Sequence, residues 1–570
     1  MTDLLNVDLT RGAVTREPLS AELESLGGHG LTSAIVSQEV DPAADPLGPG
    51  NVLVCAAGIF AGTSVPNGGR LSVGGKSPLT GGIKEANSGG SAARALAELG
   101  LRAVKVTGQA AGLSVLVVTV DGGRLVPAPE LEGLGSFETA ERLWGQYGDK
   151  VSIICAGPAG ELGAKAAAVL VTTPDHYMRA AARGGLGAVM GSKKLKAIVI
   201  DGTGGAGVTV ADAAALKAAS KALTTGIHSH PAMAALEALG SAFLVSVTQS
   251  MGCLATRNFS AGTWESAPDI SGEHMAEVIA ARPNGVTKHS CMKGCIINCS
   301  QVYTDDSGDV ITSGVEFETI GLMGSNCHID DLDQIARLDH LCDDLGLDTM
   351  DVGAAMGVAM EGGLLEWGDG AAAFALLGRL TTGDPDARLL ADGCVATGKR
   401  LGVARVPAVK GQSFAAYDPR VLKGTGTTYV TSPQGADHTC GNALPSPANP
   451  TYDPSSAEGQ AQMSEFLQCY FAAIDSLGMC LFATLPALDM PELQGEFVKA
   501  AAAITGRELP EDYLIKMGDR IVRQERDFNR RAGFTEKDDR PPAFIVEEAV
   551  RPSGNRYDVP EADLDAMFAS

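Results

Sequence analysis

The chain has 570 residues, of which 45% are hydrophobic and 20% are charged, enough for about two to four domains with buried cores. Its net charge of −24 disfavours nucleic acid and anionic membranes as partners. The sequence has no apolar run of about 18 residues, so we expect no membrane span. Residues 1–8 lack the cationic and apolar segments of a secretory signal, so we expect a cytoplasmic protein.

The negative charge is concentrated in the later part of the chain. Residues 1–205 hold 17 Lys and Arg against 19 Asp and Glu, a net charge of −2, so the remainder carries −22. Eight of the 17 cations in the first part lie in two glycine-rich stretches, 61–90 and 177–196. Glycine permits close approach of the backbone to a ligand, and the helix predicted from residue 91 offers N–H groups that favour phosphate. An irregular connection is the alternative, but we favour a site for an anionic ligand.

The hydrophobic patterns predict a β-rich first part and a mainly helical remainder. A hairpin over 4–17 and strands at 53–58, 114–120, 151–155 and 197–201 are followed by helices such as 332–345, 458–477 and 512–532. We therefore expect an α+β fold with a β-rich domain over 1–205 and mainly helical domains over 206–410 and 411–570.

Three cysteines, Cys291, Cys295 and Cys299, lie within nine positions near the middle of the chain. Thiolates this close together in a large protein usually bind a metal. Cys480 is the candidate for a fourth ligand. The C-x3-C-x3-C spacing favours a [4Fe–4S] cluster, because zinc usually takes paired C-x2-C motifs. Plain structural cysteines are the remaining interpretation.

One pattern occurs twice. Asp343-Asp-Leu-Gly-Leu-Asp348 and Asp475-Ser-Leu-Gly-Met-Cys480 each begin with Asp and end on a potential ligand. Each also closes a predicted helix, where glycine is a common cap, so capping alone is one interpretation. Because a carboxylate accepts two hydrogen bonds from a planar N–H/NH₂ edge, we favour a pseudo-symmetric site that holds two similar groups.

Acidic and histidine side chains supply candidates for proton transfer. Glu316 and Glu318 follow the cysteine segment, and we expect both carboxylates on one side of an extended chain, unless they cap the next helix. A carboxylate in a dry pocket can accept a proton. His438 lies in a loop with proline and small residues, a common place for functional groups, although a single histidine is more often structural.

Ordered motifs in every part of the chain match one known family. They are Pro66-Asn-Gly-Gly-Arg70, Lys76-Ser-Pro-Leu-Thr-Gly81, Ala86-Asn-Ser-Gly-Gly90, the run from Arg183 to Ala197, Cys342-Asp-Asp-Leu-Gly-Leu-Asp-Thr349, Ala416-Tyr-Asp-Pro-Arg420 and Asp475-Ser-Leu-Gly-Met-Cys480. On these motifs the chain resembles the aldehyde:ferredoxin oxidoreductase family of tungsten enzymes along nearly its whole length.

The resemblance implies tungsten bound by the dithiolenes of two pterin cofactors, beside one [4Fe–4S] cluster. The β-rich domain would lie under the pterins, with the two helical domains closing over them. One Asp-x-x-Gly copy is implied per pterin, and Cys480 is implied as the fourth cluster ligand. A Mg²⁺ ion bridging the pterin phosphates is compatible with this arrangement. The implied cofactor-binding residues are Arg70, Asn87, Gly89, Arg179, Ala180, Arg183, Asp343, Leu347, Asp348, Asp475 and Met479.

The implied reaction oxidises an aldehyde to a carboxylic acid. Two electrons would pass singly through the cluster to ferredoxin or a ferredoxin-like iron–sulfur subunit. Glu318 would activate water or take the proton, and His438 would hydrogen-bond the substrate carbonyl oxygen, where negative charge develops. A homodimer is compatible with the resemblance.

The sequence departs from the family pattern at three places. The family's cluster spacing is C-x2-C-x3-C, which makes Cys291 the least secure ligand. Gln434 and Cys440 stand where the best-known members have basic residues, so the surroundings of one pterin are altered. The His438 loop is closer to a bacterial branch of the family, which leaves molybdenum as an alternative to tungsten.

Two other functions stay open at this point. The same cofactors could reduce an activated or aromatic carboxyl group within a larger electron-transfer complex. A non-catalytic iron–sulfur subunit with a decayed pterin site is disfavoured by the presence of both Asp-x-x-Gly motifs together with Glu318 and His438.

Overall fold

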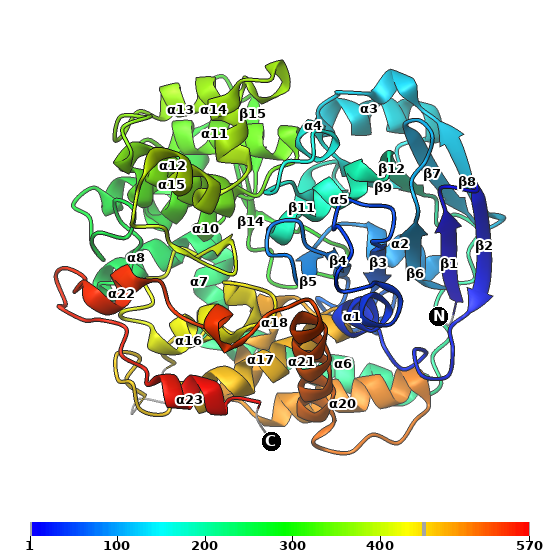
Figure 1. The fold of residues 1–570 in the computed structure, drawn as a ribbon. Coiled ribbons are helices and arrows are strands. Elements are labelled where there is room, and N and C mark those ends of the chain that lie inside the picture. Colours follow the sequence, from blue (N-terminus) through cyan, green and yellow to red (C-terminus); the bar gives the residue numbers. More distant parts are fainter. Residues whose placement is uncertain (1–2, 447–451, 569–570) are drawn as a thin grey trace.

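Two six-stranded sheets make up the first third of the chain in the computed structural model, which describes residues 3–446 and 452–568 (Figure 1). The first sheet has the order β2-β1-β6-β3-β4-β5 and the second β11-β10-β9-β12-β7-β8. Neighbouring strands are antiparallel except for the β1–β6 and β7–β12 pairs. The strands are β1 (Asp3–Asp8), β2 (Ala13–Pro18), β3 (Leu53–Ala57), β4 (Leu71–Lys76), β5 (Ile83–Ser88), β6 (Leu101–Thr107), β7 (Ser114–Thr119), β8 (Gly122–Pro127), β9 (Ser152–Ala156), β10 (Val169–Thr172), β11 (Met178–Ala181) and β12 (Leu195–Ile200).

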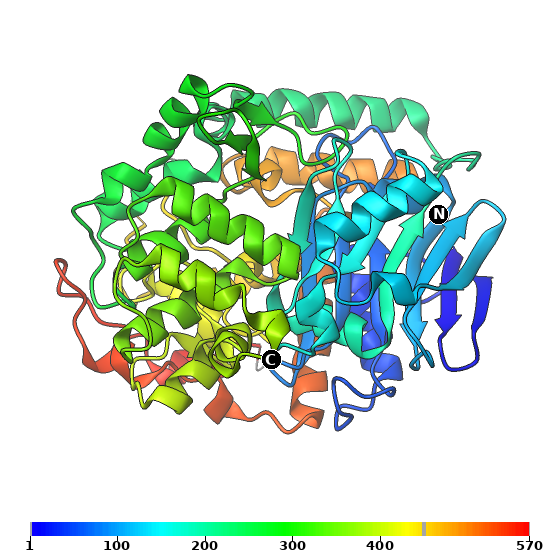
Figure 2. The ribbon, with the colours of Figure 1, turned by 90° about the horizontal axis from the view of Figure 1, so that it is seen from above.

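The two sheets share a hydrophobic core because their strands alternate. In β7, Leu116 and Val118 face the core shared with the first sheet, whereas Val115 and Val117 pack with Leu143 of helix α3 (Ser136–Tyr147). This period of two is what a strand buried on both faces requires. Helix α1 (Gly28–Glu39) covers the outer face of the first sheet and also contacts helices α17 and α21, which come from the other end of the chain (Figures 1 and 2).

The rest of the chain is mainly helical, so the expected α+β fold is confirmed. Helix α11 (Leu332–Leu345) has the predicted bounds, and α17 (Gln460–Leu477) and α21 (Tyr513–Arg531) differ from prediction only at their ends. A small sheet of β13 (Val286–His289), β14 (Ser300–Thr304) and β15 (Val310–Ser313) carries the cysteine segment between its first two strands. Other helices include α2 (Ala92–Glu98), α4 (Pro158–Glu161), α5 (Leu186–Ser192), α6 (Ala213–Ser229), α7 (Pro231–Leu239), α8 (Phe243–Met251), α9 (Gly272–Ala281), α10 (Phe317–Thr319), α12 (Thr349–Glu361), α13 (Gly370–Leu377), α14 (Pro385–Ala391), α15 (Cys394–Leu401), α16 (Lys423–Thr431), α18 (Leu481–Thr484), α19 (Pro486–Asp489), α20 (Glu492–Thr505), α22 (Ala543–Glu547) and α23 (Glu561–Ala566).

The helical cores mix segments from both helical thirds of the chain. Helix α6 packs against α20, and Phe544 and Leu564 near the end of the chain belong to the same core as α11 and α12. The boundaries at 205/206 and 410/411 therefore stay a prediction.

Two helical segments have the length and composition of a membrane span. They are the stretch Pro231–Met251, which has a mean hydropathy of 1.4, and the pair Gln460–Leu477 with Leu481–Asp489, which is bent by 118°. Core helices pass the same test, and 44% of the apolar window in the first stretch is buried inside the protein. The absence of a membrane span stays a prediction.

Glycine pairs join the helical part to the two sheets. A Cβ atom on Gly58, which follows β3, would lie 2.2 Å from the Cα of Gly478, which ends α17. A Cβ atom on Gly157, which follows β9, would lie 2.6 Å from the backbone nitrogen of Gly346, which ends α11. Each helix end is thus held against one sheet at a distance that excludes any side chain.

We expect Gly58→Ala to lower the thermal unfolding midpoint, because an overpacked contact typically costs about 1–3 kcal/mol. Gly145→Ala is the matched control, since its Cβ atom would meet nothing within 4 Å inside helix α3. Replacing glycine there should raise stability by about 0.5–1 kcal/mol. Scanning calorimetry of both variants checks the prediction, and an unchanged midpoint for Gly58→Ala would contradict the close packing.

Candidate active site

The four predicted cysteine ligands gather between the small sheet and the end of α17. Cys291, Cys295 and Cys299 are half-buried and Cys480 is buried, and all four are free thiols. Burial raises the pKa of each thiol, and the thiols raise one another's further. Because the pKa of each thiol is raised, the four thiols would lose their protons together only with a cation bound between them.

The spacing of the thiols favours a cluster over a single ion. Among the described residues, the one group of His, Cys, Asp and Glu side chains whose ligand atoms all lie within 4.8 Å of one another contains no cysteine. A single zinc ion with bonds of about 2.3 Å to sulfur would bring its thiolates closer than this. The wider spacing suits an iron–sulfur cluster. Cys291, the ligand that the sequence left least secure, lies near enough to Cys295 and Cys299 to raise the pKa of both thiols.

Asn67 joins the two sources of thiols and was missed from the sequence. The side-chain NH₂ of Asn67 donates to the Sγ of Cys295 (3.3 Å). The backbone carbonyl of Asn67 accepts from the backbone N–H of Cys480 (2.9 Å). Asn67 adopts a φ of 57°, in the left-handed region that Asn tolerates. Its place in the Pro66–Arg70 motif was the available signal. Gly89, predicted as a cofactor residue, also lies against the cluster segment, because its Cβ atom would meet the Sγ of Cys291 at 3.0 Å.

Glu316 and Glu318 are not side by side on an extended chain, so that expectation is wrong. Helix α10 begins at Phe317, so the backbone between the two carboxylates is not extended, and the two side chains bond to different partners. Glu316 accepts a hydrogen bond from Ser241 and lies near Cys299. Burial raises the pKa of Glu316. Its side chain does not cap the helix.

Glu318 and His438, the two predicted catalytic residues, lie next to each other. The Oε1 atom of Glu318 lies 3.2 Å from the Nε2 atom of His438, while its Oε2 atom accepts from the backbone N–H of Ala416 (2.7 Å). Glu318 Oε1 and His438 Nδ1 are buried and make no regular hydrogen bond. The ring of Tyr417 lies 5.8 Å from the imidazole. These contacts fix the two side chains, and Glu318 Oε1 and His438 Nδ1 stay available to a ligand.

A buried ion-pair network supports the His438 loop. Arg183 donates to the carbonyl of Ala436 (2.7 Å) and to Ser413, and it lies 3.5 Å from Asp348. Lys84 pairs with Asp437 at 2.6 Å. Burial alone would raise the pKa of Asp437, but Lys84 and Arg183 outweigh it and hold the pKa far below its ordinary value. Asp437 is therefore a fixed anion beside His438.

The two Asp-x-x-Gly copies have the same geometry. Helices α11 and α17 end on Gly346 and Gly478, with φ of 71° and 78°. In each copy the glycine N–H donates to the carbonyl of the leading aspartate, and the last residue of the motif begins the next helix. The capping interpretation is correct for both glycines. The pseudo-symmetry is also present, since each aspartate side chain occupies the equivalent place on its own helix end.

Each aspartate is half-buried near an arginine that lies in a sheet strand or directly before one. Burial raises the pKa of Asp343 to about 7, against the influence of Arg179. Burial and Glu85 raise the pKa of Asp475 to about 8, against the influence of His29 and Arg70. Arg179 is held by Ser300 and Ser313, and Arg70 by Asn87.

The structure thus divides the predicted cofactor residues into two groups, one at the end of each of these helices. Leu347 and Met479 are fully buried directly after the two capping glycines. The first group lies at the end of α11 and contains Arg179, Ala180, Arg183, Asp343, Leu347 and Asp348. The second lies at the end of α17 and contains Arg70, Asn87, Gly89, Asp475 and Met479.

Comparisons with known proteins match both parts of this architecture. The family "Aldehyde ferredoxin oxidoreductase, N-terminal domain" matches residues 4–202, and "Aldehyde ferredoxin oxidoreductase, domains 2 & 3" matches residues 218–570. The chain belongs to the aldehyde ferredoxin oxidoreductase family. It is therefore an oxidoreductase, as the sequence predicts.

Relatives of the family cover nearly the whole chain. The tungsten-containing aldehyde ferredoxin oxidoreductase of Pyrococcus furiosus is 34% identical over 97% of this chain and 92% of its own length. The enzyme of the same name from Thermococcus kodakarensis shows the same identity and coverage. Among solved structures, the active site complex BamBC of benzoyl coenzyme A reductase matches with a TM-score of 0.79, at 21% identity, over 95% of this chain and 90% of its own. At this identity the likeness shows the fold alone.

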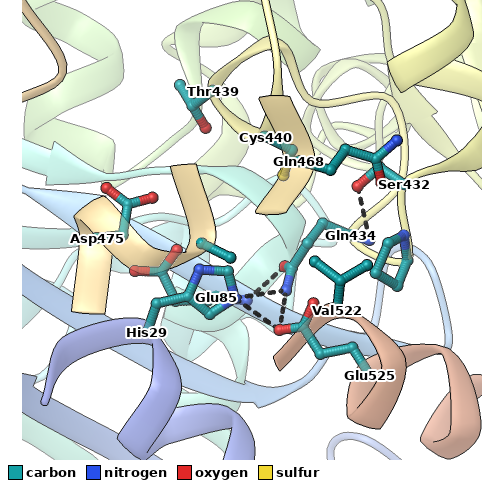
Figure 3. A pocket seen from close by; sticks show the side chains of 12 residues that line it. His29, Glu85, Ser432, Gln434, Thr439, Cys440, Gln468, Asp475, Val522 and Glu525 are labelled. Atoms are coloured by element: carbon teal, nitrogen blue, oxygen red, sulfur yellow. Dashed lines mark hydrogen bonds and ion pairs between the residues drawn. The ribbon is translucent and has the colours of Figure 1, made fainter. Parts of the chain in front are cut away.

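Two other side chains near this site, His29 and Glu525, were missed from the sequence. His29, Gln434 and Glu525 meet in a buried network beside Asp475, shown in Figure 3. Gln434 donates to Glu525 (2.7 Å) and accepts from the backbone N–H of Glu85 (2.7 Å). Gln434 was the one signal of this network in the sequence. A neutral amide where the family has a basic residue changes which charges the neighbouring side chains can carry.

We expect the cofactor-free protein to lose stability as the pH rises from about 4 to 7. The carboxyl of Asp343 has a pKa of about 7 when folded, against 3.8 ordinarily. In this window the folded state holds a proton that the unfolded chain has released, so the free energy of unfolding falls as the pH rises, by up to a few kcal/mol. Urea unfolding at pH 5 and pH 7.5 measures this slope. Asp343→Asn should flatten it, and a variant that keeps the full slope would contradict the assignment.

Proposed function

We propose that this chain is a tungsten-dependent oxidoreductase that oxidises an aldehyde to a carboxylic acid and delivers electrons through a [4Fe–4S] cluster. The observation that carries the proposal is the Glu318–His438 pair beside Asp437 and Arg183, in a chain that also holds two equivalent aspartate-bearing helix ends and four thiols close to one another. The relatives' tungsten and aldehyde names support the same assignment.

The donor sets of the two groups fit the implied cofactors. Asp343 and Asp475 are acceptors for the N–H edges of two pterins, and Arg70, Asn87, Arg179 and the backbone around Ala180 would serve their phosphates or a bridging Mg²⁺ ion. Arg183 Nε and Asp348 Oδ2, which lie 3.5 Å apart and make no hydrogen bond, would be further contacts for one pterin. Cys291, Cys295, Cys299 and Cys480 would hold the cluster. When bound, the tungsten centre supplies two-electron oxidation of the substrate carbon, and the cluster supplies single-electron transfer.

The chain's own residues would manage protons and the substrate oxygen. Aldehyde and water give a carboxylic acid, two protons and two electrons. Glu318 is the base, because its Oε1 atom is buried and free of regular hydrogen bonds while Ala416 holds its other oxygen in place. His438 would donate to the carbonyl oxygen as negative charge develops. The fixed anion of Asp437, 3.9 Å from the Nδ1 atom of His438, favours the protonated imidazole that this donation needs.

Electrons would leave through the exposed edge of the cysteine segment. Lys293 and Gly294 are exposed while the thiols beside them are half-buried, so a ferredoxin or ferredoxin-like subunit could approach the cluster there. The cytoplasmic location and a homodimer stay predictions. Reduction of an activated or aromatic carboxyl group uses the same residues in the reverse direction, and the test of activity below distinguishes it.

We expect anaerobically purified protein to contain about one tungsten or molybdenum and about four irons per chain, because the two pterins would share one metal and the chain has one set of four cluster thiols. Mass spectrometry of the metals measures both. Cys480→Ser should lose most of the iron. Iron without the heavier metal would refute both enzymatic functions, and aldehyde-dependent reduction of a viologen dye, absent for the reverse reaction, then selects between them.

Glu318→Gln should lower kcat/KM for aldehyde oxidation by about 10²–10⁴, the usual contribution of a general base. Its tungsten and iron contents should be unchanged, since Glu318 is assigned to the proton and not to cofactor binding. Glu273→Gln, an exposed acid on α9 bonded to Ser246, is the control and should keep full activity. Full activity in metal-loaded Glu318→Gln would remove the base assignment.

A further inference from the structure

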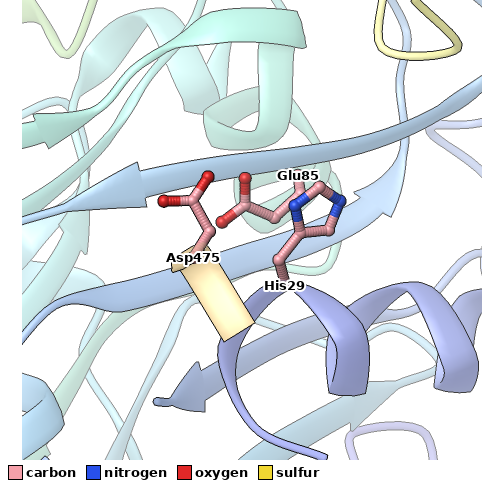
Figure 4. A group of neighbouring side chains, drawn as sticks. All are labelled: His29, Glu85 and Asp475. Carbon is pink, nitrogen blue, oxygen red and sulfur yellow. The ribbon is translucent and has the colours of Figure 1, made fainter. Parts of the chain in front are cut away.

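A second group of ligating side chains lies apart from the thiols. His29 at the start of α1, Glu85 in β5 and Asp475 near the end of α17 each place a nitrogen or oxygen atom within 4.8 Å of the others (Figure 4). Among the described residues this is the one group with that property. The three residues come from distant parts of the chain, so only the folded protein assembles them.

The orientation of His29 leaves one ring nitrogen for a ligand. Its Nε2 atom lies 2.6 Å from the carboxylate of Glu525, which also accepts from Ser33 (2.6 Å) and Gln434 (2.7 Å). The Nδ1 atom is buried and has no hydrogen-bond partner, and the residue is only 4% exposed. Histidines that bind metals usually donate their other N–H to a carboxylate, which fixes the ring. Glu525 is placed to do so.

Glu85, like His29, has a polar atom available to a ligand. It is 7% exposed, and its Oε1 atom is buried with no hydrogen-bond partner. Figure 4 shows its carboxylate between the carboxylate of Asp475 and the His29 ring. Burial raises the pKa of both acids; Glu525 raises the pKa of Glu85 further and Glu85 raises that of Asp475, while His29 lowers both. Without an ion, the protonated His29 ring offsets part of this negative charge, and a bound cation would take the place of its proton.

Space beside the group admits one more ligand. A cavity of about 10 Å³ touches all three side chains and is also lined by Gln434 and Thr439 (Figure 3). That is close to the room that a single water molecule needs. One imidazole, two carboxylates and one water form the four-ligand set that zinc accepts, with bonds of about 2.0–2.2 Å that fit atoms this close together.

We propose that His29, Glu85 and Asp475 bind one divalent transition-metal ion, Zn²⁺ or an ion of similar preference, with water as the fourth ligand. The ion would join α1 and β5 to the end of α17, and so fix the sheets to the helical part of the chain beside the glycine contact of Gly478. Asp475 has a second oxygen that stays available for a pterin edge. The site rests on its own residues and holds whether or not the proposed reaction is correct.

Zinc content and coordination test the site in the intact holoenzyme. After dialysis against Zn²⁺ and then against buffer, we expect one zinc per chain in addition to the iron and tungsten. X-ray absorption at the zinc edge should show only nitrogen and oxygen neighbours with one imidazole contribution. A sulfur neighbour would place the zinc at the cysteines, and no retained zinc would mean that the site does not bind it; either result overturns the proposal.

Variants locate the ion. His29→Gln and Glu85→Gln should weaken zinc binding at least 100-fold, and Glu525→Gln about 10–100-fold because it acts through His29. Circular dichroism of each variant checks that it is folded before its zinc content is compared. Glu39→Gln, at the exposed far end of α1, is the matched control and should retain zinc. Full zinc affinity in both His29→Gln and Glu85→Gln would also overturn the proposal, whatever the tungsten content of the variants.

Discussion

Contact between paired glycines holds the active site together. Gly58 meets Gly478 and Gly157 meets Gly346, so the last turn of each long helix lies directly on the residue that follows a central strand. Backbone bonds reinforce both contacts, from Phe60 to the carbonyl of Leu477 (2.9 Å) and from Ala168 to that of Gly346 (2.8 Å). A side chain at any of these glycines would push a helix end away from its sheet, and with it every residue of the Asp-x-x-Gly motif.

The same contacts explain the electrostatics of the site. Because the helix ends are pressed onto the sheets, Asp343 and Asp475 are taken out of water and their pKa values rise, while Arg179 and Arg70 lie close enough to oppose the rise. Without ligands, two such carboxylates do not stabilise the folded state. Ligands with N–H edges or positive charge would offset that cost, which is why we assign these residues to binding.

The loop of His438 is organised by a different means. Its backbone is held by Arg183, and its anion Asp437 is paired with Lys84, a cation from the first sheet. The sheets therefore supply fixed charges, and the helical part supplies the groups proposed to meet the substrate. Asn67 completes the link by bonding both Cys295 and the backbone of Cys480, so that the cluster ligands and the second helix end share one support.

The sequence alone determined the features that depend on local order. The end of α11 follows from helical spacing and a glycine cap, the strands follow from apolar alternation, and the close spacing of Cys291, Cys295 and Cys299 makes a metal ligand set from one short segment. Tertiary structure decided which residues from distant segments of the chain lie next to one another. The turn at Phe317 separates Glu316 from Glu318, and the meeting of His29, Glu85 and Asp475 depends on α1 packing against both the first sheet and α17. Such contacts leave no periodic signal, because a residue's neighbours across a packed interface are set by the shape of the whole fold and not by its own position in a helix or strand.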